Sequence, residues 1–113
     1  MREIKAVIQP FLLPKVVCGL LNIDHFPGIT ITKVTGFGKR KDRETNQPCE
    51  EDLVEYQSKV KIEIVVPDEM AEEVVQTIQN NAHTGKKGDG KIWVTDLLEI
   101  VKISTGKRGE RAV

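Results

Sequence analysis

Apolar and polar positions alternate at the start of the chain. Residues 3–9, EIKAVIQ, place every second side chain on one apolar face, the pattern of a strand with one buried side. Pro14 suits the first turn of a helix, and the apolar positions after it recur at helical spacing. We therefore predict a strand followed by a helix. The residues that define their apolar faces are Ile4, Ala6 and Ile8 for the strand and Val16, Val17, Leu20 and Leu21 for the helix.

A turn at residues 24–28, DHFPG, follows this helix, and the segment 28–36 reads as a second strand. The order of strand and helix then begins again, because residues 58–66 alternate strictly. Pro67 ends the third strand, and Asp68 is expected as the N-cap of a second helix. The apolar stripe of this helix consists of Met70, Val74, Val75 and Ile78.

A long final strand is predicted over residues 91–104, KIWVTDLLEIVKIS. Its alternation slips near Thr95–Leu97, which indicates a bulge or a bend. The order strand, helix, strand, long loop, strand, helix, strand predicts a ferredoxin-like α+β fold, an antiparallel βαβ-βαβ sheet with two helices on one face. The 113 residues suit one domain, 1–113.

Between the second and third predicted strands lies a long loop, at about residues 38–57. Loops of this length are uncommon in so small a domain and are usually functional or disordered. Its charges are segregated, with basic residues first and acidic residues after them. Two interpretations stay open: a solvated hairpin extension, or an arm that reaches a partner. The charged residues are Lys39, Arg40, Lys41 and Arg43, then Glu50, Glu51, Asp52 and Glu55.

A glycine loop at about residues 83–91 is the strongest chemical feature. It nearly spells the nucleotide phosphate loop G-x-x-x-x-G-K-[ST], but Ile92 replaces the hydroxyl residue, and the predicted helix precedes the loop. Gly88 and Gly90 can adopt backbone angles that let successive N–H groups converge on an anion. A plain Gly-Asp-Gly turn explains the glycines but not the lysines, so phosphate binding is favoured. These lysines are Lys86, Lys87 and Lys91.

Composition argues against several classes of function. Seventeen basic and seventeen acidic residues cancel, and only 4% of the residues are aromatic, so nucleic-acid binding is disfavoured. Cys18 and Cys49 form neither a metal-ligand set nor a disulfide framework. The chain has no apolar signal core at its start and no apolar run of about 20 residues. We expect a cytoplasmic protein without a metal site.

The segment TGKKGDGKIWV, residues 84–94, resembles the C-terminal signature of the P-II nitrogen-regulatory signal proteins. The resemblance also covers EIKAVIQPF at the start, VTGFG before the long loop, KVKIEIVVPD after it and STG near the end. It implies a non-enzymatic homotrimer that binds ATP or ADP in the clefts between subunits. It further implies that the long loop docks onto an enzyme, a regulator or a transporter, which includes membrane transporters.

Carried over residue by residue, the resemblance implies a nucleotide site built from the base of the long loop, the glycine loop, an adenine end and the last strand. It implies no catalytic residue. The implied nucleotide-binding residues are Thr30, Gly36, Phe37, Gly38, Lys39, Arg40, Glu63, Val65, Gly88, Asp89, Gly90, Lys91 and Lys102. The implied partner-facing positions of the long loop are Arg43, Cys49 and Asp52.

The sequence departs from the family pattern at several positions. The family usually places Arg-x-Arg on the final strand, where this chain has Lys102 and Ser104, so we expect a weaker preference for ATP over ADP. Arg40 stands where many members carry a magnesium-ligating glutamine, and a guanidinium has no lone pair for a metal. We expect 2-oxoglutarate and magnesium to bind weakly or not at all, although Lys59, the family's carboxylate partner, is present. Lys59 itself reads as a solvated strand residue, and Asp52 replaces the tyrosine that is uridylylated in enteric relatives.

Two other functions stay open. A P-II-like sensor of ADP or AMP would pair Arg40 with a small anion such as bicarbonate and serve carbon handling or another membrane transporter. A small phosphohydrolase would need a nucleophile or general base beside the glycine loop, which offers only Asp89, lysines and a flanking His83. We rank the enzyme below both sensors. The sequence does not name the target.

Overall fold

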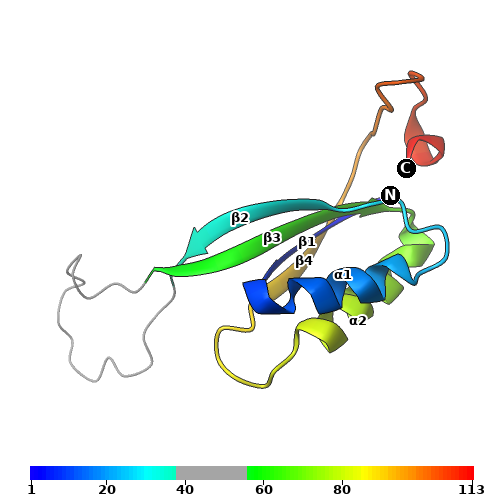
Figure 1. Ribbon diagram of the computed structural model, residues 1–113. Coiled ribbons are helices and arrows are strands. Elements are labelled where there is room, and N and C mark those ends of the chain that lie inside the picture. The colour runs from blue at the N-terminus through cyan, green and yellow to red at the C-terminus, as the bar shows by residue number, and fades with distance from the viewer. Residues whose placement is uncertain (38–55) are drawn as a thin grey trace.

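The structure is a computed structural model that describes residues 1–37 and 56–113. A four-stranded antiparallel sheet in the order β2-β3-β1-β4 carries two helices on one face (Figure 1). This arrangement confirms the predicted ferredoxin-like α+β fold. The elements are β1 (Arg2–Ile8), the 3-10 turn η1 (Pro10–Leu12), α1 (Leu13–Leu21), β2 (Thr30–Gly36), β3 (Gln57–Val66), α2 (Asp68–Ala82), β4 (Lys91–Asp96) and the 3-10 turn η3 (Gly109–Ala112).

The core lies between the sheet and the helices. The alternating faces of β1 and β3 meet in register, so that Ile4 is opposite Ile64 and Ala6 is opposite Ile62. Both predicted strand faces and the stripes of both helices contribute, and within the described residues every buried side chain is apolar. The predicted stripe of α1 was wrong at Leu21, which is 64% exposed. Burying one such aliphatic side chain stabilises the fold by about 1.5–3 kcal/mol. The largest fully buried side chains are Ile4, Ile8, Leu20, Ile62, Ile64, Ile78, Val16, Val66 and Val74.

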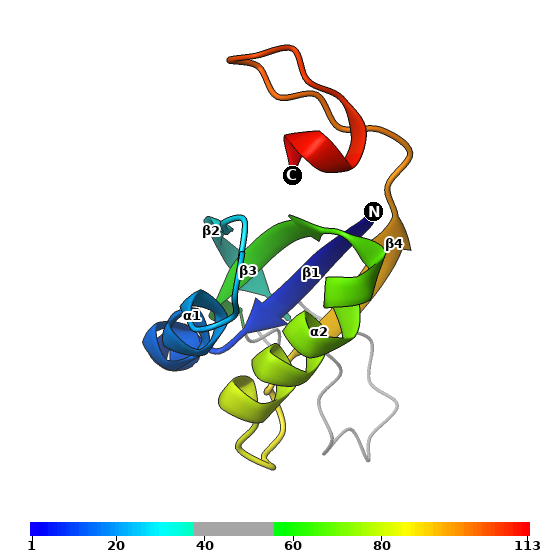
Figure 2. The same cartoon turned by 90° about the vertical axis from the view of Figure 1, so that its right-hand side faces the viewer.

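The two helices lie side by side against the sheet (Figure 2) and come close at Gly19. A Cβ atom at Gly19 would lie 2.7 Å from Asn81 Nδ2 and 3.1 Å from Thr77 Cγ2. The Asn81 amide is held there because its Nδ2 donates to the Thr77 carbonyl at 2.8 Å. Glycine weakens a helix by about 1 kcal/mol relative to alanine. Here the absence of a side chain lets α2 approach α1 closely.

The last strand is shorter than predicted. β4 ends at Asp96, which pairs with Arg2 at the first residue of β1. Pairing with β1 stops at this point, and the chain leaves the sheet. The predicted strand over 91–104 was therefore wrong beyond Asp96. The slip near Thr95–Leu97 marks the end of the strand and not a bulge within it.

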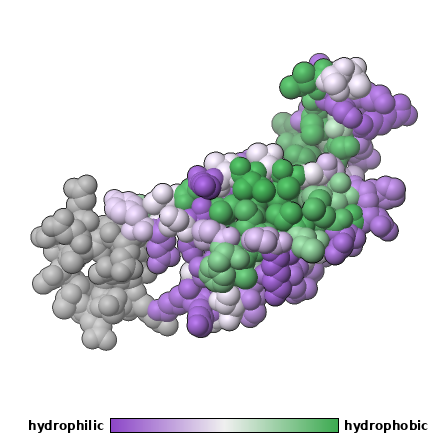
Figure 3. Space-filling model, in the orientation of Figure 1, coloured by the Kyte–Doolittle hydropathy of each residue, from purple (hydrophilic) through white to green (hydrophobic). Residues whose placement is uncertain are grey.

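The C-terminal segment, residues 97–113, projects from the sheet on the side away from the helices (Figures 1 and 2). A tight turn shapes it, in which the Gly106 N–H donates to the Lys102 carbonyl at 2.7 Å. Leu98 and Ile103 are 97% and 99% exposed. The space-filling view shows apolar surface on this segment and over the face where α1 and β2 lie (Figure 3).

The start of α2 also differs from the prediction. Pro67 is the N-cap, with φ −60° and ψ 154°, and Asp68 is the first helical residue without a side-chain capping bond. The predicted N-cap role of Asp68 was wrong because Pro67 already supplies the extended residue that precedes the helix. The Asp68 carboxylate instead lies 3.3 Å from Arg2 Nε, and at this position it complements the positive end of the helix dipole.

Candidate functional site

The glycine loop between α2 and β4 is organised by the carboxylate of Asp89. Thr84 donates to it from its N–H at 2.8 Å and from its hydroxyl at 2.5 Å, and the Gly85 N–H donates at 3.0 Å. These bonds lower the pKa of Asp89 to about 2, and the bond from the Thr84 hydroxyl has the largest effect. The loop therefore places its one carboxylate inward, against three donors, and leaves its lysines exposed.

The glycines of the loop adopt left-handed backbone angles. Gly85, Gly88 and Gly90 have φ values of 84°, 89° and 96°, which confirms the prediction made for the last two. Gly90 has a second reason to be glycine, since a Cβ atom there would lie 1.7 Å from the carbonyl oxygen of Val7. Close packing on β1 thus explains Gly90 without any ligand.

Lys59 joins the glycine loop to β3. Its Nζ donates to the carbonyl of Gly88 at 2.5 Å. The polar ends of Gln57 and Gln9 line the same place, each 3.8 Å from where a Cβ atom of Gly88 would be. The interpretation of Lys59 as a solvated strand residue was wrong. No local pattern could have shown this contact, because its partners are 29 residues apart.

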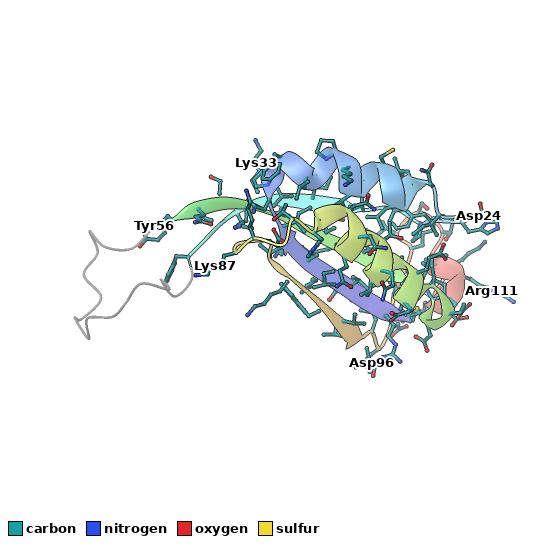
Figure 4. The ribbon with its side chains drawn as sticks, turned by 90° about the horizontal axis from the view of Figure 1, so that it is seen from below. Asp24, Lys33, Tyr56, Lys87, Asp96 and Arg111 are labelled. Carbon is teal, nitrogen blue, oxygen red and sulfur yellow. The ribbon has the colours of Figure 1, made fainter. Side chains whose placement is uncertain are left out.

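The two ends of the long loop meet at the same end of the molecule. Gly36 pairs with Gln57, which the sequence places in the long loop but which already belongs to β3. Beyond this pair, the rings of Phe37 and Tyr56 stack edge to face with centroids 5.5 Å apart. Lys87 of the glycine loop lies near this end too (Figure 4). The glycine loop therefore lies beside the base of the long loop.

The other predicted site residues are spread along the chain. Thr30 pairs with Glu63, and Val65 follows two residues later, farther along the sheet from the long loop. Lys91 is the first residue of β4. Lys102 lies in the C-terminal segment, at the opposite end of the sheet from the glycine loop (Figure 1). Within a single chain, Lys102 therefore does not reach the glycine loop. The predicted residues Gly38, Lys39, Arg40, Arg43, Cys49 and Asp52 lie outside the described residues.

Within residues 1–37 and 56–113, no group of three or more His, Cys, Asp or Glu side chains could hold a metal ion. No helix in the same ranges has the length and apolar character needed to cross a membrane.

The fold and the site together define a small α+β protein whose glycine loop is fastened to the base of a long loop. The profile of the family described as nitrogen regulatory protein P-II matches residues 1–107. The chain belongs to the P-II family. It is 42% identical over 113 residues to the nitrogen regulatory protein P-II of Azospirillum brasilense and 42% identical to P-II 1 of Escherichia coli strain K12, with 100% of both chains covered in each comparison.

A solved structure supports the same assignment. The crystal structure of Arabidopsis thaliana PII bound to citrate superimposes with a TM-score of 0.81 at 36% identity, covering 99% of this chain and 91% of that chain. P-II proteins are regulatory signal proteins of the nitrogen system and not enzymes. The chain is therefore a nitrogen regulatory signal protein, and the phosphohydrolase alternative is set aside.

Proposed function

We propose that this protein is a homotrimeric sensor of adenine nucleotides, in which ATP or ADP bound between protomers controls how the long loop engages a target protein. One observation carries the proposal. The Lys59 ammonium ties Gly88 of the glycine loop to β3 at 2.5 Å, beside the base of the long loop. A phosphate at the glycine loop would therefore lie next to the segment that it is to control.

The glycine loop fits a polyphosphate. Backbone N–H groups in left-handed turns form concave anion sites, and Lys86, Lys87 and Lys91 supply exposed positive charge. The carboxylate of Asp89 would repel phosphate if it faced outward. It is instead bonded to Thr84 and Gly85, so it shapes the loop.

Assembly between protomers is supported by the position of the C-terminal segment. Lys102 belongs to the C-terminal segment, which lies at the opposite end of the sheet from the glycine loop (Figure 1), so it could join a phosphate site only on a neighbouring chain. Leu98 and Ile103 are almost fully exposed, and apolar side chains that project so far from the core favour burial against another protomer. A homotrimer satisfies both observations.

Nucleotide binding would act on the long loop by favouring one of its conformations. A ligand shifts such an equilibrium only by its differential affinity for the two conformations. β2 ends at Gly36, and Lys39 and Arg40 come three and four residues later in the chain, so their cations would reach phosphate in one conformation of the long loop and not in the other. Arg43, Cys49 and Asp52 would then be presented to the target.

The preferred nucleotide follows from the cations of the final segment. One ammonium at Lys102 and a hydroxyl at Ser104 replace the two guanidinium groups usual in the family, and one charge-assisted hydrogen bond contributes about 1.5–3 kcal/mol. A loss of this size reduces polyphosphate affinity about ten-fold or more. We expect ATP and ADP to bind with similar affinity. This supports the alternative of an ADP or AMP sensor that also takes a small anion such as bicarbonate.

The same reasoning applies to 2-oxoglutarate. Lys59 already uses one of its three donors on the Gly88 carbonyl, and Arg40 offers no metal ligand. Binding of magnesium and 2-oxoglutarate is therefore expected to be weak or absent. The target is proposed to be a protein in or facing the cytoplasm, with a membrane transporter as one candidate.

Light scattering after gel filtration, followed by calorimetric titration, tests the proposal. We expect a mass of three protomers and binding of ATP and ADP within about ten-fold of each other, with little change on adding magnesium and 2-oxoglutarate. A second titration adds AMP and bicarbonate to test the alternative. A monomer, or a protein that binds no adenine nucleotide at millimolar concentration, would refute the sensor.

A further inference from the structure

A pocket of about 390 Å³ lies between α2 and β4, on the helix side of the sheet. Its floor is apolar and consists of Ile8, Val75, Ala82 and Ile92. Ile8 and Ala82 belong to the buried core, whereas Val75 and Ile92 are half-buried and pack against it. The volume falls in the range of pockets that hold small organic molecules. None of the predicted adenine-end residues lines this pocket.

The rim of the pocket is polar and carries one negative charge. Gln79, His83 and Asp89 line it, with His83 Nδ1 3.8 Å from Asp89 Oδ2. Lys91 also lines the pocket, while its neighbour Ile92 packs against the core. Because strand side chains alternate between faces, the ammonium of Lys91 belongs to the opposite face of the sheet.

The C-terminal end of α2 adds to this negative character. The last four carbonyl groups of a helix have no partner within the helix, and together they form the negative end of its dipole. His83, the C-cap, is extended at φ −76° and ψ 127°, and the last turn of α2 contains no basic residue. Over the described residues, no protein hydrogen bond from outside the helix reaches a carbonyl of this turn. Ala82, the last residue of α2, lines the pocket.

We propose that this pocket binds a small molecule with a compact apolar body and an ammonium group. The apolar body would cover the floor formed by Ile8, Val75 and Ile92. The ammonium would donate to the free acceptors at the end of α2 and to the rim, where the amide oxygen of Gln79 is available. A carboxylate ligand of the same shape would meet the carbonyls and Asp89 and be repelled.

A ligand in this pocket would contact the glycine loop from behind. Asp89 and Gly90 line the pocket and belong to the loop that we propose binds phosphate. Occupancy would therefore restrict the loop and change nucleotide affinity. This coupling rests on the proposed function, whereas binding of the amine does not.

Three probes of one shape test the charge preference: isoamylamine, isoamyl alcohol and isovalerate. Each is titrated into the full chain while amide shifts are followed by NMR. We expect isoamylamine to shift Gln79, His83 and Gly90 at the lowest concentration, the alcohol to bind more weakly, and isovalerate to bind least. Equal or tighter binding of isovalerate overturns the proposal, and so does the absence of saturable shifts with all three probes.

Two matched lysine variants locate the site. Gln79→Lys places a cation on the rim and is expected to weaken isoamylamine binding at least about ten-fold. Asn80→Lys adds the same charge at the next exposed residue, which does not line the pocket, and is expected to leave binding within about two-fold. If both variants weaken binding equally, the site lies elsewhere. Both residues are exposed, so neither change disturbs the core.

The coupling is measured separately as ADP affinity with and without saturating isoamylamine. A change of three-fold or more in the wild type, lost in Gln79→Lys, supports it. If isoamylamine binds and ADP binds but neither affects the other, only the coupling fails. If isoamylamine binds and no nucleotide binds, the nucleotide sensor fails and the pocket stands.

Discussion

At the scale of single residues, Asp89 and Gly90 have different reasons for their identities. The Asp89 carboxylate holds the glycine loop by accepting three hydrogen bonds. Gly90 lies so close to the Val7 carbonyl that no side chain fits. The first residue determines the shape of the loop, and the second fixes where the loop meets the sheet. A phosphate site would depend on both, although neither would supply positive charge.

The pKa of Asp89 provides a direct test of the loop geometry. Thr84→Val removes the largest cause of the lowered pKa, so the value should rise from about 2 toward the ordinary 3.8. Carbon-detected NMR titration of the Asp89 carboxyl measures it. Thr105→Val, which changes a threonine in the C-terminal segment, serves as the control and should leave the value unchanged. An unaltered pKa in Thr84→Val would contradict the described hydrogen bonds.

The same carboxylate predicts a pH dependence. Because the pKa of Asp89 is lower in the folded chain, about 2 against 3.8, its stabilising bonds are fully present above pH ~4. They are lost as the pH falls through about 2. The Thr84 and Gly85 amide shifts should therefore be constant from neutral pH to pH ~4 and then move. Movement centred near the ordinary value of 3.8 would show that the bonds to Asp89 do not lower its pKa.

Gly90 and Gly106 form a matched pair for a stability measurement. Both have positive φ, 96° and 73°, but a Cβ atom at Gly106 would meet nothing within 4 Å. Gly90→Ala should reduce the free energy of unfolding by about 2–5 kcal/mol, from backbone strain plus overlap with Val7. Gly106→Ala should cost at most about 1–2 kcal/mol. Urea denaturation compares them, and equal losses would exclude the close contact.

At the scale of elements, β3 connects the proposed ligand site to the long loop. One face of β3 supplies core residues such as Ile62, while the other face presents Lys59 to the glycine loop. The strand then runs directly into the base of the long loop at Gln57. The strand thus connects the core, the glycine loop and the base of the long loop. This arrangement favours β3 as the element through which nucleotide occupancy would reach the long loop.

Removing the Lys59 ammonium should uncouple the glycine loop from β3. Lys59→Met keeps the length and most of the volume of the side chain but cannot donate to the Gly88 carbonyl. We expect altered amide shifts at Gly88 and a three- to thirty-fold loss of ADP affinity, measured by calorimetry. Lys33→Met on β2 removes a lysine elsewhere on the sheet and should leave both unchanged. Normal affinity in Lys59→Met would show that this bond does not support the site.

The sequence predicted the elements well and their contacts poorly. Strict alternation in 58–66 identified a strand and its buried face, because one side of that strand packs on the helices. The end of β4 at Asp96 could not be predicted, since it depends on where β1 stops pairing. The contacts of Lys59 with Gly88 and of Gly90 with Val7 depend on how distant segments meet in the fold. The pocket beside α2 was also beyond local patterns, because it joins a helix, a loop and two strands.

At the scale of the whole molecule, the proposed function makes one chain incomplete by two criteria. Its C-terminal segment projects away from the core (Figure 2), and that segment carries Lys102, which the proposed phosphate site requires from another protomer. Assembly would therefore bury the apolar side chains of this segment and complete the ligand site in one step. Nucleotide binding and oligomerisation should then stabilise each other.

A charge in the projecting segment should break the assembly. Leu98→Glu places a carboxylate where we propose an apolar protomer contact, and the mass measured by light scattering should fall from three protomers to one. Leu21→Glu makes the same change on α1, where Leu21 is 64% exposed, and should leave the mass unchanged. A Leu98→Glu variant that remains a trimer would show that the segment does not hold the protomers together.

The outer strands of the sheet have a practical consequence. β2 and β4 lie at its two margins, and each margin carries a row of backbone amide and carbonyl groups that can recruit a foreign strand. Any variant that separates the protomers should therefore be examined for turbidity and fibril-specific dye binding during storage. Such preparations are best kept cold and dilute, because precipitation would otherwise be mistaken for misfolding of the individual chain.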